Sequence, residues 1–413
     1  MLSSPLSQKQ VVLGVTGSIA AYKAADLASK LAQSGAIVQT ILTRAATEFV
    51  SALTFQSVTG QPAYRDADLW GAQAHVLHVG LAHQSDMLVI APITADMIAK
   101  LAHGHADDLL SLIALAFGPG QPARPLLLAP AMDGGMYSHP ATQENLRLLA
   151  QRGATIVGPE AGHLASGLIA VGRMTDPAEL LGHIRYALTR QGPLQGRKVA
   201  VTAGGTQEPL DPVRVLTNRS SGKQGFALAQ AALDAGAEVL LITGPVALPT
   251  PGGANLIRVE TASDMEQAVL EACQEADVLL MAAAVADFRP AQIATQKIKK
   301  QEGLPWINLE PTPDILAAVA ERRRKAHKPD VVVGFAAETK ELIENARSKL
   351  HTKQLDLIVA NDVSAADSGF AVDTNRVTLL KSSGEVESLP LMSKAEVAER
   401  IIGEVASILL KSG

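Results

Sequence analysis

Short apolar runs alternate with amphipathic segments along the whole chain. Continuous runs rich in Val, Ile, Leu and Ala are typical of parallel strands buried on both faces, with helices as the connections between them. The pattern predicts an α/β fold made of two Rossmann-like or flavodoxin-like three-layer domains with mainly parallel sheets. The predicted strands cover residues 11–16, 37–43, 87–92, 125–130 and 155–158 in the first half and 198–203, 238–243, 277–282, 330–335 and 356–360 in the second.

A break between the halves is predicted near residue 190. The helical pattern from Pro177 to Arg190 ends in Gln-Gly-Pro-Leu-Gln-Gly at residues 191–196, where glycine and proline favour a loop. A chain of 413 residues fits about two domains. We therefore expect one domain over residues 1–190 and a second over 191–413.

The composition and the amino-terminal sequence bear on the cellular location of the protein and on the class of its partners. A single cysteine, Cys273, excludes an intramolecular disulfide and favours a reducing, cytoplasmic location, with Cys273 itself an inert residue of helix packing. The amino-terminal residues lack a signal-peptide pattern, and no apolar run is long enough to span a membrane. The net charge of −5 gives no signal for a polyanion. We expect neither nucleic acid nor membrane as a partner.

Two glycine-bearing loops follow the strand at 198–203. The first holds Gly204 and Gly205, and the second runs from Asn218 to Gly225 into a helical pattern, where backbone donors favour an anion. The second loop departs from the P-loop pattern because Gln224 follows its lysine. Two interpretations stay open, a tight strand-to-helix turn or a phosphate-binding crevice, and the polar residues crowded between the loops favour the crevice.

The first half has its own candidate crevice. Small residues from Gly17 to Ala21 separate a strand from a helix, as a mononucleotide or flavin phosphate requires, although such turns also occur without a ligand. Two further strands end at Ala-Pro, at residues 91–92 and 129–130, and polar residues follow each. The apolar segment 162–174 is predicted to be a loop that acts as a lid.

Histidines and lysines offer further chemistry. His75, His78 and His83 either form a zinc site or include one histidine for acid–base chemistry, and the second interpretation is favoured because no Cys or His-Glu-x2-His pattern accompanies them. Lys349 and Lys353 share a helix face, where they form either a solvated stripe or a binding site for a triphosphate with Mg²⁺.

These motifs resemble a known family across nearly the whole chain. The family is that of the bifunctional phosphopantothenoylcysteine decarboxylases/phosphopantothenate-cysteine ligases of bacterial coenzyme A synthesis. The resemblance rests on residues 14–23, 91–96, 130–136, 202–214, 218–223, 282–287, 297–300, 313–315, 334–339 and 360–363.

For the second half, the resemblance implies a ligase that joins 4'-phosphopantothenate to L-cysteine. CTP would activate the carboxylate as an acyl-cytidylate, which the amine of cysteine then attacks. The matching position implies that Asn218 holds the acyl-cytidylate, that Lys297 is needed for turnover and that Asp287 lies beside CTP and binds Mg²⁺. The remaining residues implied to surround CTP are Ala283, Pro313, Asp314, Ile315, Phe335, Lys349 and Lys353.

For the first half, the resemblance implies an FMN-dependent decarboxylase that converts 4'-phosphopantothenoylcysteine into 4'-phosphopantetheine. His78 matches the family's active-site histidine. Asp133 stands where many members have Asn, and Ser166 stands where many have a cysteine that protonates the intermediate. The residues implied to bind FMN are Gly17, Ser18, Thr43, Pro92, Thr94, Ala95 and Met132.

The two departures leave three interpretations of the first half: a working decarboxylase, a flavin domain with altered decarboxylation, or an FMN-dependent module that only assembles ligase domains. In the first, His78, His163 or an Asp133 whose pKa is raised by burial would donate the proton instead of Ser166. The resemblance also implies a homo-oligomer with trimeric flavin domains and dimeric ligase domains, such as a dodecamer.

Overall fold

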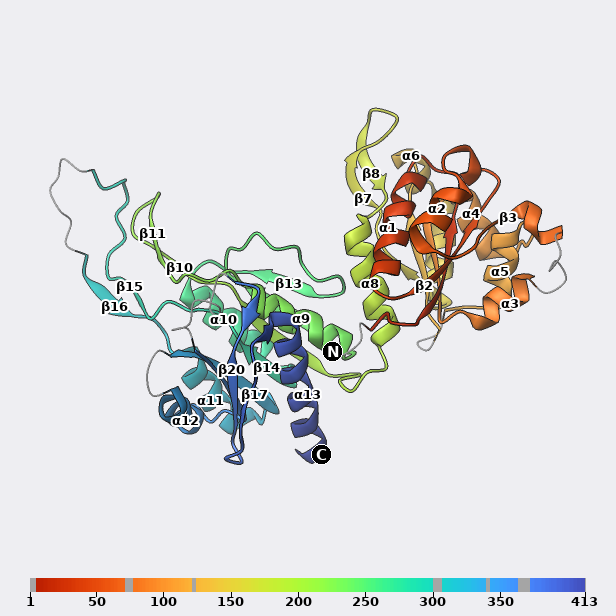
Figure 1. Cartoon of the computed structure of the whole chain (residues 1–413). Coiled ribbons are helices and arrows are strands. Elements are labelled where there is room, and N and C mark those ends of the chain that lie inside the picture. Colours follow the sequence, from red (N-terminus) through yellow and green to blue (C-terminus); the bar gives the residue numbers. More distant parts are fainter. Residues whose placement is uncertain are drawn as a thin grey trace. The chain divides into compact units, whose positions relative to one another are not determined.

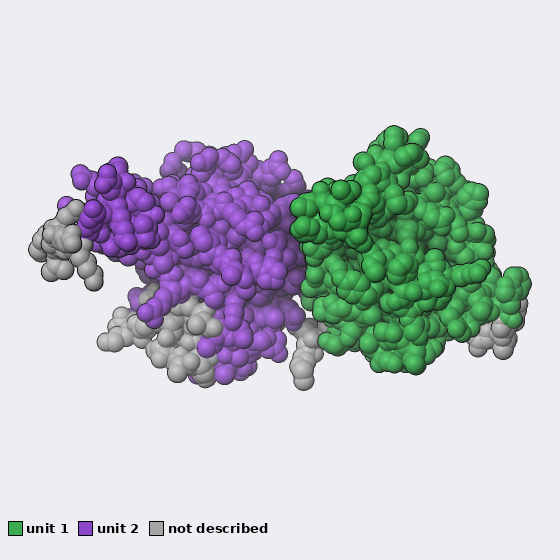
Figure 2. All heavy atoms as spheres, turned by 90° about the horizontal axis from the view of Figure 1, so that it is seen from above, with its two compact units in different colours: residues 1–191 green, residues 192–413 purple. Residues whose placement is uncertain are grey.

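The protein forms two compact units, residues 1–191 and residues 192–413, which are coloured separately in Figure 2. The computed structural model describes residues 5–70, 77–120, 124–299, 307–338, 342–362 and 372–412 (Figure 1). The units are considered one at a time.

The first unit is built on a parallel sheet with strand order β3-β2-β1-β4-β5-β6. From β1, strands β2 and β3 extend the sheet on one side, and β4, β5 and β6 extend it on the other side. The strand order therefore reverses between β1 and β4. The bounds are β1 (Gln10–Val15), β2 (Ile37–Leu42), β3 (Ala63–Arg65), β4 (Met87–Ile93), β5 (Leu126–Pro130) and β6 (Thr155–Ile156).

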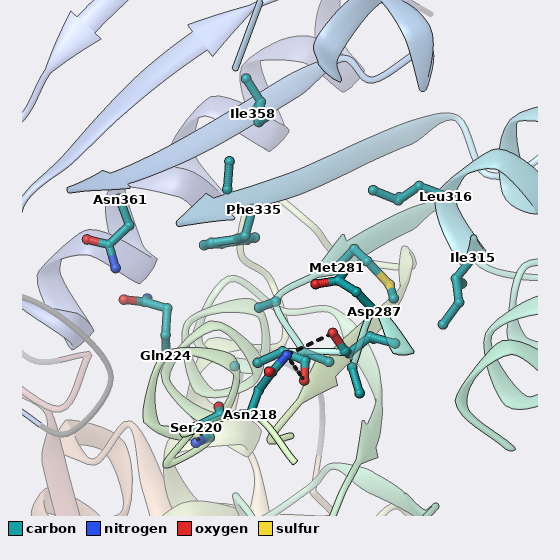
Figure 3. Close-up of a pocket in the computed structure, with 18 of the residues that line it drawn as sticks. Asn218, Ser220, Gln224, Met281, Asp287, Ile315, Leu316, Phe335, Ile358 and Asn361 are labelled. Atoms are coloured by element: carbon teal, nitrogen blue, oxygen red, sulfur yellow. Dashed lines mark hydrogen bonds between the residues drawn. The ribbon is translucent and has the colours of Figure 1, made fainter. Parts of the chain in front are cut away.

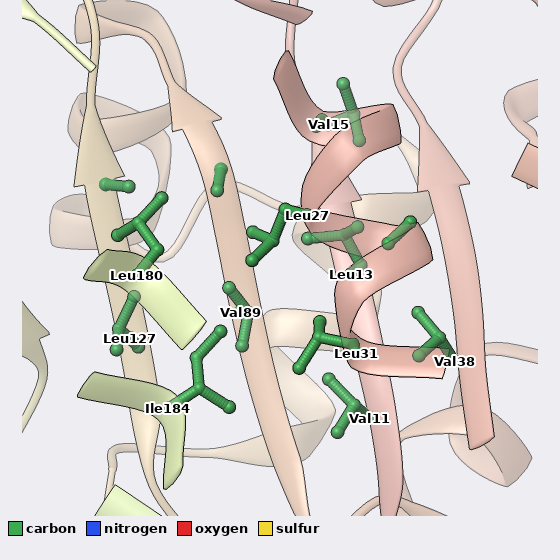
Figure 4. Close-up of a cluster of buried hydrophobic side chains, with 14 of the residues drawn as sticks. Val11, Leu13, Val15, Leu27, Leu31, Val38, Val89, Leu127, Leu180 and Ile184 are labelled. Carbon is green, nitrogen blue, oxygen red and sulfur yellow. The ribbon is translucent and has the colours of Figure 1, made fainter. Parts of the chain in front are cut away.

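Helices cover both faces of this sheet. On one face, Val11 and Leu13 of β1 belong to one buried cluster with Leu27 of helix α1 (Ala21–Gln33) and Ile184 of helix α8 (Pro177–Thr189) (Figure 4). The other face holds alternate strand residues and four helices, namely α3 (Leu77–Gln84), α4 (Ala95–His103), α5 (Leu109–Phe117) and α7 (Pro140–Gln151). Side chains that alternate between two buried faces explain why the strands read as continuous apolar runs.

Residues 160–173 correct one prediction. They form an antiparallel hairpin of β7 (Glu160–His163) and β8 (Ile169–Arg173), where the sequence predicted an irregular loop. Leu168 and Ile169 are exposed, at 57% and 73% of their surface, so the hairpin has no buried apolar face to mark it as strand. It lies beside the short helix α6 (Gly134–Ser138) that follows β5.

The second unit contains a sheet with strand order β13-β12-β9-β14-β17-β18-β20-β21. The pairs from β13 to β18 are parallel, whereas β18–β20 and β20–β21 are antiparallel. The order again reverses, here between β9 and β14. The bounds are β9 (Lys198–Ala203), β12 (Glu238–Thr243), β13 (Asn255–Arg258), β14 (Val278–Met281), β17 (Val331–Glu338), β18 (Leu357–Asp362), β20 (Val377–Lys381) and β21 (Val386–Ser388).

Helices α9 (Lys223–Asp234) and α13 (Lys394–Ser412) pack against each other over this sheet. The other core contains residues of α10 (Ala262–Ala272), α11 (Ile315–Ala326) and α12 (Leu342–Thr352). Cys273, at the end of α10, is fully buried, and burial raises the pKa of its thiol to about 11, which confirms a packing role. The predicted α/β class with mainly parallel sheets is confirmed.

Two hairpins project from the second unit (Figure 1). One joins β10 (Gln207–Pro209) to β11 (Val215–Thr217), and the other joins β15 (Phe288–Pro290) to β16 (Leu309–Pro311). A third small ladder pairs β19 (Thr374–Asn375) with β22 (Met392–Ser393). None of the helices in the described residues has the length and apolarity to cross a membrane.

Candidate functional site

A cavity of about 610 Å³ opens at the carboxyl ends of the strands in the second unit. Its walls include the segment from Asn218 to Gly225, which follows β9, and the segment from Met281 to Asp287, which follows β14 (Figure 3). These are the two strands between which the strand order reverses. Open parallel sheets bind their ligands at this point, because loops on either side of it diverge and leave a crevice.

Hydrogen bonds hold the two walls together. Nδ2 of Asn218 donates to the backbone oxygens of Val285 at 2.9 Å and Ala284 at 3.4 Å (Figure 3). The hydroxyl of Thr206 accepts from the amide of Ala286 at 2.9 Å. Asn218 thus joins the two walls of the cavity, and its amide carbonyl oxygen can accept a hydrogen bond from a ligand.

The second glycine loop reaches the sheet closely enough to require glycine. A Cβ placed on Gly225 would lie 2.5 Å from Cβ of Ala203 and 2.8 Å from the backbone oxygen of Thr202. Helix α9 therefore begins directly against β9. Its N-cap, Gly222, has φ of 74° and offers no capping side chain, so backbone N–H groups of the first turn face the cavity end.

The cavity carries an excess of positive charge. Four lysines and two aspartates line it, namely Lys223, Lys349, Lys353, Lys394, Asp287 and Asp314. Lys353 donates to Asp314, the N-cap of α11. Although burial acts to raise it, the pKa of Asp314 lies below its usual value because Lys353 and the amide of Ala317 donate hydrogen bonds to the carboxylate. Such a site favours an anionic ligand.

Most residues predicted for this site come together. Those that line the cavity are Asn218, Ala283, Asp287, Pro313, Asp314, Ile315, Phe335, Lys349 and Lys353. Lys297 is not among the lining residues. It is exposed on the segment between β15 and β16, which is attached to the β10–β11 hairpin by the amides of Ala294 and Ile298.

Sequence reasoning missed several lining residues. Gln224, Thr312, Asn375 and Lys394 also face the cavity, and Lys394 is 6% exposed. Lys394 is the first residue of the final helix and belongs to no strand-end motif. Its only sequence signal is the helix start to which it belongs, where Ser393 and Glu396 exchange hydrogen bonds between backbone amide and side chain.

The first unit has a comparable edge where its strand order reverses. Oγ1 of Thr16, after β1, donates to the backbone oxygen of Pro92 at 2.9 Å and accepts from the amide of Thr94 at 3.0 Å. Thr94 is also the N-cap of α4, and α1 begins at Ala21 on the same edge. Two helix amino termini and several hydroxyls thus meet there, which suits the phosphate of a mononucleotide.

The predicted FMN residues surround this edge. A Cβ on Gly17 would lie 2.4 Å from Cβ of Ala45, so only glycine allows the turn after β1 to approach the turn after β2. Thr43 closes that second turn by accepting from the amide of Ala46 at 3.3 Å. Ser18 lies in the turn after β1, Pro92 lies near the carboxyl end of β4, and Ala95 is the first residue of α4. A cradle of small residues and hydroxyls fits a planar cofactor with a phosphate.

The turn after β5 is held by the β7–β8 hairpin. The amide of Met132 donates to the backbone oxygen of Gly172 at 3.0 Å, and Oγ of Ser166 donates to Oδ2 of Asp133 at 2.7 Å. The hydrogen bonds from Ser166 and from the amide of Gly135 lower the pKa of Asp133. This corrects the prediction of an Asp133 carboxyl whose pKa is raised by burial, because the carboxylate is partly exposed and hydrogen-bonded in its charged form.

His78 lies on α3, and its Nδ1 is buried without a hydrogen-bond partner among the described residues. A buried nitrogen without a partner is unusual in a folded protein and marks His78 for attention. His75, which belongs to the zinc alternative, lies outside the described residues. Within the part of the chain that the structure covers, no three His, Cys, Asp or Glu side chains are grouped to bind a metal.

Comparison with known proteins matches both units. The model for the flavoprotein family matches residues 2–188, and the model for the DNA/pantothenate metabolism flavoprotein C-terminal domain matches residues 194–409. The coenzyme A biosynthesis bifunctional protein CoaBC of Bacillus subtilis is 43% identical over 411 residues, which cover 99% of each chain. The chain belongs to the CoaBC family.

Other members are similarly related. The CoaBC protein of Mycobacterium tuberculosis is 43% identical over 97% of each chain. A crystal structure of the C-terminal domain of a CoaBC protein is 40% identical, covers 53% of this chain and 99% of that one, and has a TM-score of 0.46. The resemblance predicted from the motifs is thus confirmed at the level of the family.

Proposed function

We propose that the protein carries out two successive steps of coenzyme A biosynthesis. In the first, the second unit joins 4'-phosphopantothenate to L-cysteine at the expense of CTP. In the second, the first unit decarboxylates the product, 4'-phosphopantothenoylcysteine, to 4'-phosphopantetheine. The observation that carries the proposal is the lysine-rich cavity at the strand-order reversal of a CoaBC-family chain.

The ligase step uses the charges of that cavity. A carboxylate oxygen of 4'-phosphopantothenate attacks the α-phosphorus of CTP, and pyrophosphate leaves. The amine of cysteine then attacks the acyl carbon, loses a proton and expels CMP. Negative charge grows on the leaving pyrophosphate, and we assign its stabilisation to Lys349 and Lys353, which line the cavity. Asp287, which lines the cavity, would hold a Mg²⁺, and the ion would supply positive charge beside the phosphates.

Asn218 positions the reacting groups. Because its Nδ2 is used by Val285 and Ala284, its orientation is fixed and its oxygen faces the ligand. We assign to Asn218 the role of holding the acyl-cytidylate. Lys297 is assigned to turnover, although it lies on an exposed segment outside the cavity wall.

The decarboxylase step is assigned to the strand-order reversal of the first unit. Thr16, Gly17 and Ser18 with Thr94 and Ala95 would hold FMN, whose phosphate is favoured by the helix amino termini there. FMN supplies the oxidation and reduction of the cysteinyl sulfur and carbon. Since Asp133 is held as a carboxylate, proton donation falls to His78, with His163 on β7 as the second candidate.

One observation favours an altered first unit. Ser166 is bonded to Asp133, and a serine hydroxyl is a far weaker acid than a thiol. An FMN domain that decarboxylates differently, or that only assembles the ligase, is therefore the second candidate. Trimeric flavin units, dimeric ligase units and a cytoplasmic location belong to the same proposal.

Separate units test the assignment. A chain beginning at Gln191 keeps Leu194, which is fully buried and donates its amide to Ala235, so it retains the ligase core. We expect this chain to release pyrophosphate only with CTP, 4'-phosphopantothenate and cysteine together. We expect residues 1–191 to be yellow with bound FMN and to release CO₂ from 4'-phosphopantothenoylcysteine. Ligation by the chain that begins at Gln191, without CO₂ release by residues 1–191, would support an FMN domain with altered decarboxylation.

A further inference from the structure

A buried carboxylate outside the cavity lies at the turn of the β10–β11 hairpin. The side chain of Asp211 is fully shielded from solvent, although this hairpin projects from the second unit (Figure 1). Its Oδ1 accepts from the backbone amides of Val213 at 2.8 Å and Arg214 at 2.9 Å, which closes the turn. Burying a charge is costly unless hydrogen bonds replace its water, and these two bonds occupy only one of the two oxygens.

The second oxygen reaches the segment between β15 and β16. Oδ2 of Asp211 accepts from the backbone amide of Ile298 at 3.2 Å and from Nη1 of Arg214 at 3.3 Å. The backbone oxygen of Leu210, the residue before Asp211, accepts from the amide of Ala294 at 3.0 Å. The segment is thus attached to the β10–β11 hairpin at two points, Ala294 and Ile298.

The second of these points adjoins Lys297. Residues 291–299 form neither helix nor strand, and an irregular segment samples many backbone conformations unless specific bonds hold it. The amide of Ile298 belongs to the peptide group that joins it to Lys297. Its bond to Asp211 therefore fixes that peptide group and, with it, the direction in which the side chain of Lys297 leaves the backbone.

The carboxylate of Asp211 is ionised, which strengthens this bond. Burial acts to raise the pKa of Asp211, but hydrogen bonds from the amides of Val213, Ile298 and Arg214 place the pKa below its ordinary value. An ionised acceptor binds an amide about twice as strongly as a neutral one. The ion pair with Arg214 adds little by comparison, because that side chain is 45% exposed.

We propose that Asp211 is a positioning residue for Lys297. Through the amide of Ile298, the carboxylate holds residues 291–299 against the β10–β11 hairpin and so sets where the ammonium of Lys297 is presented. The proposal rests on the role in ligation assigned to Lys297 above. It adds to that role a residue that does not line the cavity, and it assigns to Asp211 no contact with a substrate.

The test uses the full-length protein with Asp211→Asn. The amide oxygen of the new side chain can still accept from Val213 and Arg214, whereas the NH₂ group in place of Oδ2 cannot accept from Ile298. We expect kcat for ligation to fall about 10- to 100-fold, as misplacement of a reacting group by about 1 Å implies. The KM for CTP should stay the same, because the cavity wall is intact. A ligating wild type whose kcat equals that of Asp211→Asn would overturn the proposal.

A second comparison shows whether Asp211 acts through Lys297. In a protein that already carries Lys297→Gln, we expect Asp211→Asn to cause no further loss of kcat, because the effects of coupled residues do not add. An equal loss in both backgrounds would mean that Asp211 acts through the turn or through Arg214, and would overturn the proposal. Asp264→Asn is the matched control, since its carboxylate accepts from the amide of Thr261 and does not line the cavity, and kcat should not change.

Hydrogen exchange keeps the proposal apart from the ligase assignment, because it needs no turnover. We expect Asp211→Asn to speed amide exchange within residues 291–299 at least about tenfold, and Asp264→Asn to leave it unchanged. A wild type that does not ligate but shows this difference would contradict the ligase assignment and support the bond between Asp211 and the segment. A ligating wild type with neither the exchange difference nor the loss of kcat would contradict the proposal alone.

A second variant covers a failure of Asp211→Asn to fold. Asp211→Ser keeps a hydroxyl that can accept hydrogen bonds within the turn, but its oxygen ends one atom short of the position of Oδ2. We expect the same loss of kcat and the same faster exchange in residues 291–299. Wild-type kcat and wild-type exchange in Asp211→Ser would overturn the proposal.

Discussion

Oγ of Ser166 donates a hydrogen bond to Oδ2 of Asp133 at 2.7 Å. The resemblance implied that the chain departs from the usual family residues at these two positions, and the structure places them in direct contact between the β7–β8 hairpin and the turn after β5. A hydroxyl that donates to a carboxylate stabilises the charged form. The two departures therefore act as one unit, whose product is an ionised Asp133 held beneath the hairpin.

The first prediction concerns acid stability. A depressed carboxyl pKa contributes stability above the unfolded pKa of about 3.9, and this contribution is lost as the pH falls through the lower folded pKa. Ser166→Ala should raise the pKa of Asp133 toward its ordinary value, so the variant should be less stable than the wild type above about pH 3.9 and should lose less stability as the pH falls below it. Urea unfolding between pH 2 and pH 7 measures the shift.

Ser138→Ala is the matched control, because Ser138 lies on the neighbouring short helix and donates only to the backbone oxygen of Gly135. An acid limb that is the same in both variants would contradict the hydrogen bond. We also expect Ser166→Ala to retain most decarboxylation, since its hydroxyl is a poor acid.

The second prediction concerns the packing of the hairpin on the site. A Cβ on Gly172 would lie 2.1 Å from the backbone oxygen of Met132, so Gly172→Ala must displace the turn that carries Asp133. Overpacking of this kind costs roughly 1–3 kcal/mol, and FMN should be retained more weakly. Thermal unfolding and flavin content of the purified protein measure both effects.

Gly80→Ala provides the comparison, because Gly80 lies within α3 and its added Cβ would meet nothing within 4 Å. This change should stabilise the unit by roughly 0.5–1 kcal/mol through helix propensity. Equal stability of the two variants would show that the hairpin moves freely over the turn.

The third prediction concerns Asn218. Asn218→Asp replaces the donor to Val285 and Ala284 by a carboxylate that those two carbonyl oxygens repel. Ligation should fall at least about tenfold, while the fold is retained because the side chain is exposed. Pyrophosphate release reports the rate, and Asn255→Asp on β13 introduces the same charge away from the cavity. A loss of ligation of equal size in both variants would mean that the added negative charge alone causes the loss.

The fourth prediction concerns Lys297. Lys297→Gln should lower ligation about 10²- to 10³-fold, as removal of a cation that stabilises the leaving pyrophosphate implies. The fold should be unaffected, since Lys297 is exposed. Lys299→Gln, two residues away and also exposed, should keep most activity. Normal acyl-cytidylate formation and turnover by Lys297→Gln would remove this lysine from the mechanism.

The sequence predicted the sheets well because strands buried on both faces leave continuous apolar runs. It missed the β7–β8 hairpin, since Leu168, Ile169 and Val171 are exposed and their spacing reflects no buried face. It also missed β20 and β21, which extend the sheet by antiparallel pairing after the last predicted strand.

The residues of the cavity also differ in how far the sequence could predict them. Residues at strand ends, such as Phe335, could be predicted because parallel strands present their carboxyl ends at one edge. Lys394 could not, because α13 reaches the cavity by packing on elements distant in sequence, above all α9, and no strand-end motif marks its first residue. The bond between Asp133 and Ser166 joins two segments whose closeness depends on the unpredicted hairpin.

The most direct test of the proposed function is one reaction with the full-length protein. Equal amounts of 4'-phosphopantothenate, L-cysteine and CTP are incubated with FMN-loaded enzyme and Mg²⁺, and the products are identified by mass spectrometry. We predict CMP, pyrophosphate, CO₂ and 4'-phosphopantetheine, with no product when CTP is omitted. Absence of 4'-phosphopantothenoylcysteine and of every later product would contradict the ligase, whereas accumulation of 4'-phosphopantothenoylcysteine, or of a thiol product two mass units lighter than 4'-phosphopantetheine, would contradict a complete decarboxylase in the first unit.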